Sequence, residues 1–157
     1  MGNRQGITFQ SSGNGNVIGG TAAGAGNVIA NNSQSGLDVL SGTGNSFLGN
    51  AIYSNALNGI NLGSDGVTAN DTGDGDGGTN AQQNYPVLYS AVTDTTDTVW
   101  VDASLNSTSN TTYRVEFFAD SVSGDTHGEG QTYLGFTTVT TNGSGDVSFG
   151  ASLYGQA

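Results

Sequence analysis

Gly36-Leu37-Asp38-Val39 is the stretch that decides the fold, because its pattern occurs twice more in the first part of the chain. The same order of glycine, apolar, polar and apolar residues stands at Gly6-Ile7-Thr8-Phe9 and at Gly59-Ile60-Asn61-Leu62. This alternation predicts very short β-strands. From position 36 to position 59 the repeat spans 23 residues, and from position 6 to position 36 it spans 30. The segment 21–26 is interpreted as a corner insertion that explains most of the difference.

Further short strand signals lie between these three, bounded by Gly and Asn, which tolerate the left-handed backbone of a tight corner. They stand at Asn16-Val17-Ile18, Asn27-Val28-Ile29, Asn45-Ser46-Phe47 and Ile52-Tyr53-Ser54-Asn55. A repeat of this length with three short strands predicts one turn of a parallel β-helix, with about two coils in all. The inward residues would be Ile7, Phe9, Leu37, Val39, Ile60 and Leu62, with Thr8, Asp38 and Asn61 facing solvent.

Asparagines at the predicted corners are expected to stack, so that their amides form hydrogen-bonded ladders from coil to coil. The residues concerned are Asn31, Asn32, Asn50 and Asn55. A leucine-rich-repeat horseshoe is the competing solenoid. Leucine is too rare for that alternative, and no helical leg is indicated.

Residues 64–84 have no periodicity and hardly any apolar content, which is typical of a long loop or a domain boundary. The following Tyr85-Pro86-Val87-Leu88 is apolar again, and we expect it to dock against the end of the β-helix. The predicted organisation is therefore β-helix coils over 1–63, an acidic linker or loop over 64–90, and a second domain over 91–157.

That second domain shows the alternation of antiparallel strands with one buried face. Four strands are predicted, at 99–105, 112–118, 133–139 and 147–153, with Val99, Val101, Ala103 and Leu105 on one face of the first. Asn142-Gly143-Ser144-Gly145 predicts a hairpin between the last two strands. Together they predict a partial antiparallel β-sandwich.

Composition agrees with an all-β fold and excludes several kinds of partner. Gly numbers 27 and hydrophobic residues make up 34%, which leaves too little apolar surface for a large helical core. The net charge is −11, with two cations, Arg4 and Arg114. Nucleic acids and anionic membrane surfaces are therefore poor partners. The chain has no cysteine, and no apolar stretch approaches the ~20 residues that span a bilayer.

Several phrases resemble the right-handed parallel β-helix repeat proteins of bacteria, within the pectate-lyase-like superfamily. They are residues 15–21, 25–29 and 55–60 for the repeats, 66–71 with 83–88 for the junction, and 113–119 with 128–135 for a recurring β-sandwich module. The resemblance implies an exported or cell-surface protein of non-catalytic type. Such proteins have more coils and a longer sandwich, so both ends look cut.

The densest group of oxygen ligands in the chain is Asn70, Asp71, Asp74 and Asp76. Calcium prefers six to eight hard oxygens, and alternating Asp and Gly lets one loop wrap around the ion. No glutamate stands at the closing position, so this is not an EF-hand. The segment is interpreted as a solvated acidic linker, with a calcium site formed by these four residues as the competing hypothesis.

No catalytic constellation is expected. The coils offer Asp38 alone and Arg4 in the first segment, whereas a glycosidase needs two carboxyl groups roughly 5–10 Å apart. His127 lies in a Gly-rich loop and is interpreted as exposed. Trp100 and Tyr113 are either sandwich core or a sugar-stacking platform. Arg114 and Glu116 are expected to form a surface ion pair.

The sequence therefore predicts a structural or adhesive module of a bacterial secreted or cell-surface protein, with calcium as the candidate cofactor. The alternatives are a fragment of a carbohydrate-active β-helix, of the polysaccharide lyase or hydrolase kind, and a carbohydrate-binding module. Self-association through open coil or strand edges is expected. Carbohydrate is a further candidate partner, whereas nucleic acid and membrane insertion are not expected.

Overall fold

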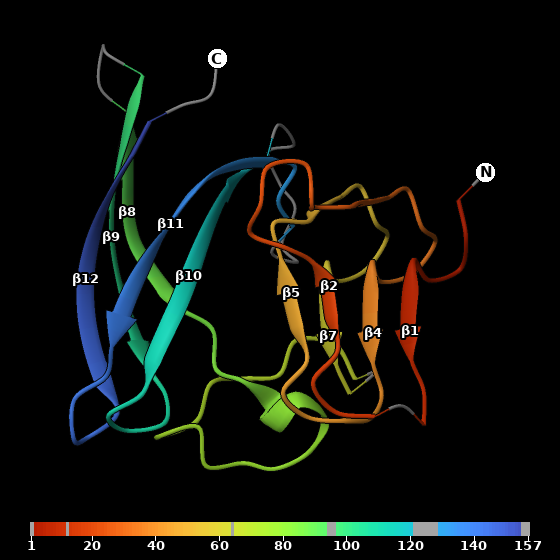
Figure 1. The fold of residues 1–157 in the computed structure, drawn as a ribbon, viewed down its shortest axis with the longest axis horizontal. Coiled ribbons are helices and arrows are strands. Elements are labelled where there is room, and N and C mark those ends of the chain that lie inside the picture. Colours follow the sequence, from red (N-terminus) through yellow and green to blue (C-terminus); the bar gives the residue numbers. More distant parts are fainter. Residues whose placement is uncertain (1, 12, 64, 94–96, 121–128, 155–157) are drawn as a thin grey trace. The chain divides into compact units, whose positions relative to one another are not determined.

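A computed structural model describes residues 2–11, 13–63, 65–93, 97–120 and 129–154, and the fold is all-β (Figure 1). The chain divides into two compact units. The first comprises residues 1–68, 77–82 and 118–133, and the second comprises 69–76, 83–117 and 134–157. The segment 64–90 predicted as a linker is thus divided between the units.

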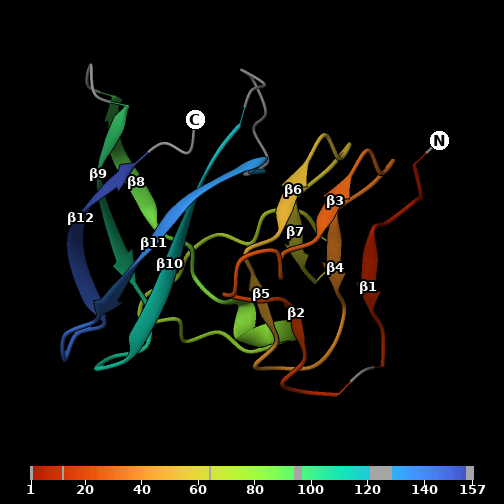
Figure 2. The ribbon, with the colours of Figure 1, turned by 45° about the horizontal axis from the view of Figure 1, so that its top comes forward.

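The first unit contains three short parallel sheets, whose strands follow one another along the chain in a repeating order (Figures 1 and 2). In the largest sheet β4 (Leu37–Val39) pairs with β1 (Ile7–Phe9) on one side and β7 (Ile60–Leu62) on the other. The predicted alignment of Ile7, Leu37 and Ile60 is confirmed by this register. The other pairs are β2 (Val17–Gly19) with β5 (Ser46–Leu48), and β3 (Val28–Ala30) with β6 (Ala51–Tyr53).

The predicted corner insertion is also confirmed. Gly19 pairs with Leu48, and Val28 pairs with Ala51. The connection from β2 to β3 therefore takes residues 20–27, whereas the equivalent connection from β5 to β6 takes residues 49–50.

Close approach of successive passes explains why glycine precedes the repeated strands. A Cβ atom on Gly6 would lie 2.5 Å from the carbonyl oxygen of Gly36 and 2.5 Å from a methyl carbon of Ile29. On Gly36 it would lie 2.7 Å from a methyl carbon of Ile52. Both positions are too crowded for a side chain, so glycine here is a packing requirement.

The core of this unit is an apolar cluster, in which Phe9, Leu37 and Val39 are buried as predicted. Phe9 also meets the ring of Phe47 edge-on, with centroids 5.6 Å apart. Ile60 was expected to join this core, but it is 40% exposed. No strand of the described residues pairs with the far side of β7, the strand that carries Ile60.

The expectation that Asp38 and Asn61 face solvent is wrong, because both are buried. The Nε2 of Gln5 donates to Asp38 Oδ2 over 2.7 Å, so a neighbouring side chain covers the carboxylate. The short 3₁₀ segment η1 (Thr79–Gln82) lies against β7, the strand that carries Asn61. Only Thr8, on the first strand of the column, is exposed as predicted.

Asparagine ladders join the passes at the corners, as the sequence predicts for Asn32, Asn50 and Asn55. The Nδ2 of Asn32 donates to Asn55 Oδ1 over 2.7 Å. The Nδ2 of Asn27 donates to Asn50 Oδ1 over 2.9 Å. No described ladder bond involves Asn31, whose φ of 60° places it in the left-handed region. A third ladder, which was not predicted, joins Asn16 to Asn45 over 2.8 Å.

Two ladders continue onto residues far along the chain. Asn80 donates from Nδ2 to the carbonyl oxygen of Asn45 and accepts the Asn45 N–H. The carboxylate of Glu129 accepts from Asn55 Nδ2 over 2.7 Å and from the Asn55 N–H. Next to it, Gly130 forms an antiparallel bridge with Ile52. Asn80, Glu129 and Gly130 therefore bond polar groups of the later strands of this unit.

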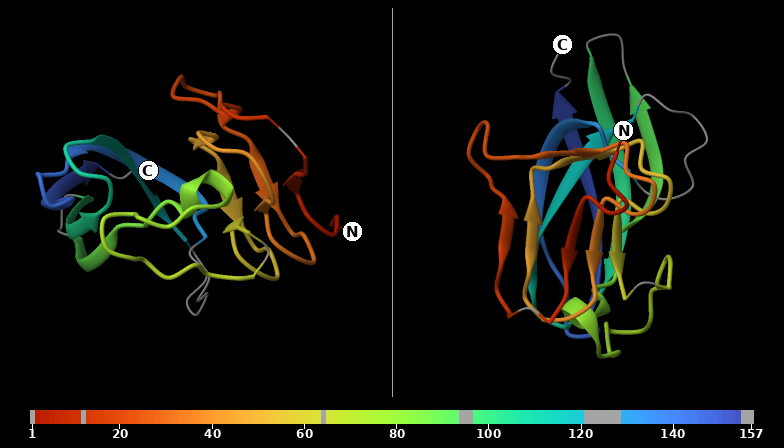
Figure 3. Two further views of the ribbon diagram at one scale, coloured as in Figure 1. Left: turned by 90° about the horizontal axis from the view of Figure 1, so that it is seen from below. Right: turned by 90° about the vertical axis from the view of Figure 1, so that its right-hand side faces the viewer.

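The second unit is built from antiparallel strands arranged as in a β-sandwich (Figure 3). One sheet has the order β12-β9-β8, formed by β8 (Val87–Thr93), β9 (Thr98–Asn106) and β12 (Asp146–Tyr154). The other pairs β10 (Thr112–Ala119) with β11 (Thr132–Thr140). The four predicted strands are confirmed, whereas β8 was missed. Val87 and Leu88, which were expected to dock against the end of the β-helix, pair with Ser104 and Ala103 of β9.

The predicted hairpin between the last two strands is wrong as well. A turn does form, since Asn142 Oδ1 accepts the N–H groups of Ser144 and Asp146. However, β11 pairs with β10, and β12 pairs with β9. The turn therefore carries the chain from one sheet to the other.

Apolar residues of the facing strands form the core of this unit. As predicted, Val101, Ala103 and Leu105 on the inner face of β9 are buried. They belong to two apolar clusters, which Phe117 and Phe149 both join. This core fixes the polar ends of the strands, next to which the acidic loop lies.

Candidate functional site

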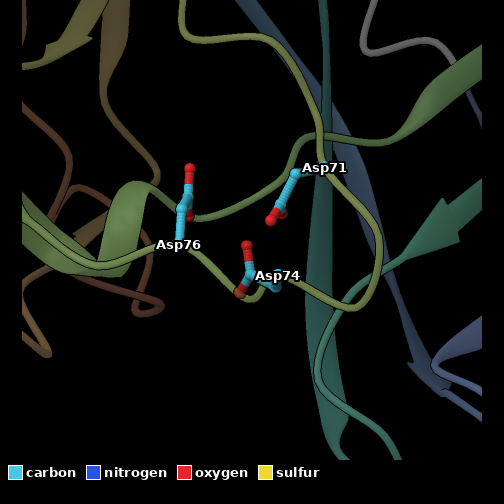
Figure 4. Close-up of side chains that lie close together, drawn as sticks. All are labelled: Asp71, Asp74 and Asp76. Carbon is cyan, nitrogen blue, oxygen red and sulfur yellow. The ribbon is translucent and has the colours of Figure 1, made fainter.

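The structure brings together three of the four predicted ligand residues. One carboxylate oxygen each of Asp71, Asp74 and Asp76 lies within 4.8 Å of the others. Figure 4 shows the side chains of Asp71 and Asp74 pointing toward one another, with Asp76 beside them. The predicted cluster therefore forms, and all three residues belong to the second unit.

The fourth predicted ligand, Asn70, bonds to Tyr85 with both atoms of its side-chain amide. Its Oδ1 accepts the N–H of Tyr85 over 2.9 Å, and its Nδ2 donates to the Tyr85 carbonyl oxygen over 2.8 Å. The side chain thus imitates a backbone strand and holds the loop to the start of the sandwich. These two bonds make Asn70 a positioning residue for the loop.

Asp74 is held from two sides by residues of the second unit. Its Oδ1 accepts the N–H of Asn84 over 2.7 Å, and its Oδ2 accepts from Ser107 Oγ over 3.0 Å. Asn84 is buried, and its Nδ2 donates to the carbonyl oxygens of Asp71 and Asn106. These bonds fix the path of the loop and the direction of the Asp74 carboxylate.

Sequence reasoning missed the two residues that hold Asp74. Asn84 lies in the junction segment 83–88, directly before the chain becomes apolar again. This position could have indicated a structural role for its side chain. Ser107 has no such signal, because it is one serine among many that follow a strand. Its hydroxyl is fully buried and also contacts Tyr113 Oη at 2.8 Å.

Electrostatic repulsion acts inside the cluster. Desolvation and the neighbouring carboxylates of Asp71 and Asp74 raise the pKa of Asp76 above its ordinary value of 3.8. Asp71 accepts the N–H of Gly75, which stabilises its own negative charge. Three converging carboxylates without a cationic side chain among them form an arrangement that a hard divalent cation would neutralise.

A separate hollow of about 260 Å³ lies on the first unit, lined by Phe47, Asn50, Ile52, Gly59, Ile60, Phe118, Glu129 and Gly130. Glu129 contributes the carboxylate of this lining, and it is already bonded to Asn55. Among the described residues that line the hollow, Glu129 is the one with a carboxylate.

The remaining residues singled out in the sequence have mixed outcomes. Trp100 is exposed, whereas Tyr113 packs against the core, so the two do not form a joint platform. Arg114 and Glu116 form the predicted ion pair, with Nε and Oε1 2.7 Å apart, although the Glu116 side chain is largely buried. The guanidinium of Arg114 also lies 3.5 Å from the ring centroid of Phe136. His127 lies outside the described residues.

No protein-family model, curated protein or solved structure matches the chain. Among the described residues, no helix has the length and apolar character that crossing a membrane requires.

Proposed function

We propose that the chain is a non-enzymatic structural module of a bacterial secreted or cell-surface protein. About two coils of a right-handed parallel β-helix act as a stiff scaffold, and the β-sandwich follows as a second building block. The resemblance of residues 15–21, 25–29 and 55–60 to β-helix repeat proteins supports the bacterial and extracellular assignment. The observation that carries the proposal is the common register of the three parallel strand columns in the first unit.

This register makes the first unit stiff. Each pass is fixed to the next by strand bonds on three sides and by asparagine ladders between them. In such a solenoid the stability of one coil depends on its neighbours, so the stack resists local opening. A scaffold or spacer needs such resistance to opening. Catalysis does not directly depend on it.

Calcium is the proposed stabilising ligand of the acidic loop. The converging oxygens of Asp71, Asp74 and Asp76 support this, as does the raised pKa of Asp76, because bound calcium would remove the repulsion. The ion would cross-link the loop to the strand ends that hold Asn84 and Ser107. Backbone carbonyls and water would complete a coordination number of six to eight.

Limited proteolysis of the purified chain tests the scaffold function. Residues 7–62 should survive protease concentrations that cleave an unfolded control, and calcium should slow cleavage within 64–84. Rapid cutting inside 7–62 would contradict the proposal.

A polysaccharide assay tests the proposal that the chain is not an enzyme. Incubation with polygalacturonate and with neutral polysaccharides should give neither new reducing ends nor unsaturated products. Reproducible turnover of either kind would overturn this assignment, even if the scaffold itself proves resistant.

A further inference from the structure

The outer face of the sheet β12-β9-β8 in the second unit presents an ordered surface. Residues directly opposite one another on paired strands point to the same face. The inner residues Val101, Ala103 and Leu105 are buried in the core. The alternate positions Trp100, Asp102 and Ser104 therefore lie on the outer face, each at the centre of a cross-strand row.

The first row is apolar and aromatic. Trp100 pairs with Val92 of β8 and with Ser152 of β12. Trp100 is 55% exposed, and Val92 is 60% exposed. A tryptophan with so much open area on the face of a sheet, rather than in its core, is a feature that marks interaction surfaces.

A β-bulge brings a second aromatic ring to the face. The register of β8 shifts between Leu88 and Ser90, so that Tyr89 is an extra residue in the strand. Bulges re-aim side chains in this way. The Tyr89 hydroxyl lies 2.7 Å from Ser104 Oγ. This contact fixes the ring above the row in which Ser104 pairs with Val87 and Ser148, although Tyr89 is 68% exposed.

The row centred on Asp102 is polar, and its side chains are short. Ser90 and Gly150 pair with Asp102 from either side, and Ser90 Oγ donates to Asp102 Oδ2 over 3.0 Å. On β12 the outward positions Ser148, Gly150 and Ser152 carry small side chains or none. The surface between the two aromatic residues is thus flat, and it offers hydroxyl groups and one carboxylate.

We infer that this face binds a neutral polysaccharide chain. Aromatic rings stack on the C–H face of pyranose rings, and carboxylates and hydroxyls accept hydrogen bonds from sugar hydroxyls. From Trp100 to Ser104 the strand advances four residues, about 13 Å at ~3.3 Å per residue, which suits several linked sugars rather than one.

Charge selects the neutral class. The three rows contain Asp102 and no arginine or lysine, and the chain as a whole has a net charge of −11. Uronates, sulfated glycans and nucleic acids would be repelled. Phe136, an exposed aromatic residue of the other sheet, has the guanidinium of Arg114 at 3.5 Å and does not offer a comparable platform.

This binding goes beyond the proposed scaffold function and uses neither the calcium loop nor the parallel strands. Because Trp100 is the sole tryptophan of the chain, its fluorescence reports on this face alone. The experiment titrates the full chain with soluble neutral polysaccharides (β-glucan, xylan, mannan) and with polygalacturonate. At least one neutral polymer should shift or quench the emission, whereas polygalacturonate should not.

Variants place the binding on the named residues. In affinity electrophoresis, Trp100→Ala and Tyr89→Ala should each weaken retardation at least tenfold, and Tyr89→Phe should weaken it less. Phe136→Ala is the matched control and should bind like wild type. Thermal unfolding by circular dichroism should show Trp100→Ala to be folded, since the side chain is largely exposed.

Three outcomes would overturn the inference. They are no response of the emission to any neutral polymer, retardation that survives both Trp100→Ala and Tyr89→Ala, and an emission shift that depends on protein concentration alone. The last would assign the face to a second copy of the chain. None of these outcomes would affect the protease test of the scaffold, so the two proposals fail separately.

Discussion

The two units differ in what holds their strands together. In the first unit, three-residue strands carry few apolar side chains, and buried asparagines such as Asn32 and Asn55 join one pass to the next. In the second unit, strands of seven to nine residues bury alternate apolar side chains between two sheets. Side-chain amides thus supply in one unit the cohesion that apolar area supplies in the other.

This difference predicts different sensitivities. A ladder amide is a donor and an acceptor at once, so its loss leaves several buried groups unsatisfied. A sandwich core loses contacts in proportion to the volume removed. The first unit should therefore be vulnerable at its asparagines as well as at its small apolar cluster.

The largest effect is expected from Leu37→Asp, which attacks the centre of the first unit. Leu37 is 0% exposed, and an unpaired carboxylate there would be costly. The free energy of unfolding should fall by more than the ~2–5 kcal/mol that truncation of a buried leucine costs. Circular dichroism should show loss of the first unit's signal. Leu57→Asp, at a 47% exposed site, is the control and should change stability by no more than about 0.5 kcal/mol.

Asn55→Ala tests the ladders, and it should destabilise the protein by roughly 2–4 kcal/mol, because buried donors and acceptors lose their partners. The Asn55 amide bonds to Asn32, to the Ile29 carbonyl oxygen and to Glu129. Asn16→Ala, in a less buried ladder, should cost about 1 kcal/mol. Chemical denaturation measures both. Equal, small losses would mean that the amide ladders contribute little.

Asp76→Asn sharpens the comparison in the second unit. Because the folded pKa of Asp76 is raised, its ionised form opposes folding at pH values above that pKa. The variant should therefore melt at a higher temperature than wild type at pH 7 in chelator. The gain should vanish as pH falls through the raised pKa toward 3.8.

In millimolar calcium, wild type should melt at a higher temperature than Asp76→Asn. Calcium should raise the melting temperature of wild type and leave Asp76→Asn almost unchanged, because the variant lacks one ligand. Asp97→Asn, an exposed position of the same unit, should respond to calcium like wild type. A wild-type melting curve that calcium does not move would leave the loop as a solvated acidic segment.

The smallest effect on stability is expected from Thr8→Pro, which probes the open edges of β1, β2 and β3. Among the described residues each of these strands pairs on one side only. The Ile7 N–H and the Phe9 carbonyl face β4, so the Thr8 N–H points to the open edge. Sedimentation at micromolar concentration should show that wild type self-associates and that Thr8→Pro does so less. A monomeric wild type would exclude association through this edge.

Sequence reasoning succeeded where the determining signal was local. The repeat around Leu37 gave the register of the parallel strands, because each recurrence carries the same glycine and apolar residues. The alternation at 99–105 and 147–153 gave the long strands and their buried faces for the same reason. The gathering of Asp71, Asp74 and Asp76 followed from their closeness in the chain.

It failed where residues far apart in the sequence decide the outcome. Asp38 was expected to be exposed, but Gln5 covers it, and no pattern around residue 38 indicates that contact. The turn at 142–145 was expected to close a hairpin, but the choice of sheet depends on β9, some forty positions earlier. The roles of Ser107 and Tyr89 also arise from pairing between distant strands.

Amide hydrogen exchange, measured residue by residue, tests most directly whether the first unit is a stable stack. The Leu37 N–H donates to the Gly59 carbonyl oxygen over 2.9 Å, and the Ile52 N–H donates to the Gly130 carbonyl oxygen over 2.9 Å. Both amides should exchange as slowly as those of Val101 and Ala103 in the sandwich core. Rapid exchange at Leu37 and Ile52, with slow exchange kept at Val101 and Ala103, would contradict the scaffold and leave the sandwich as the only stable unit.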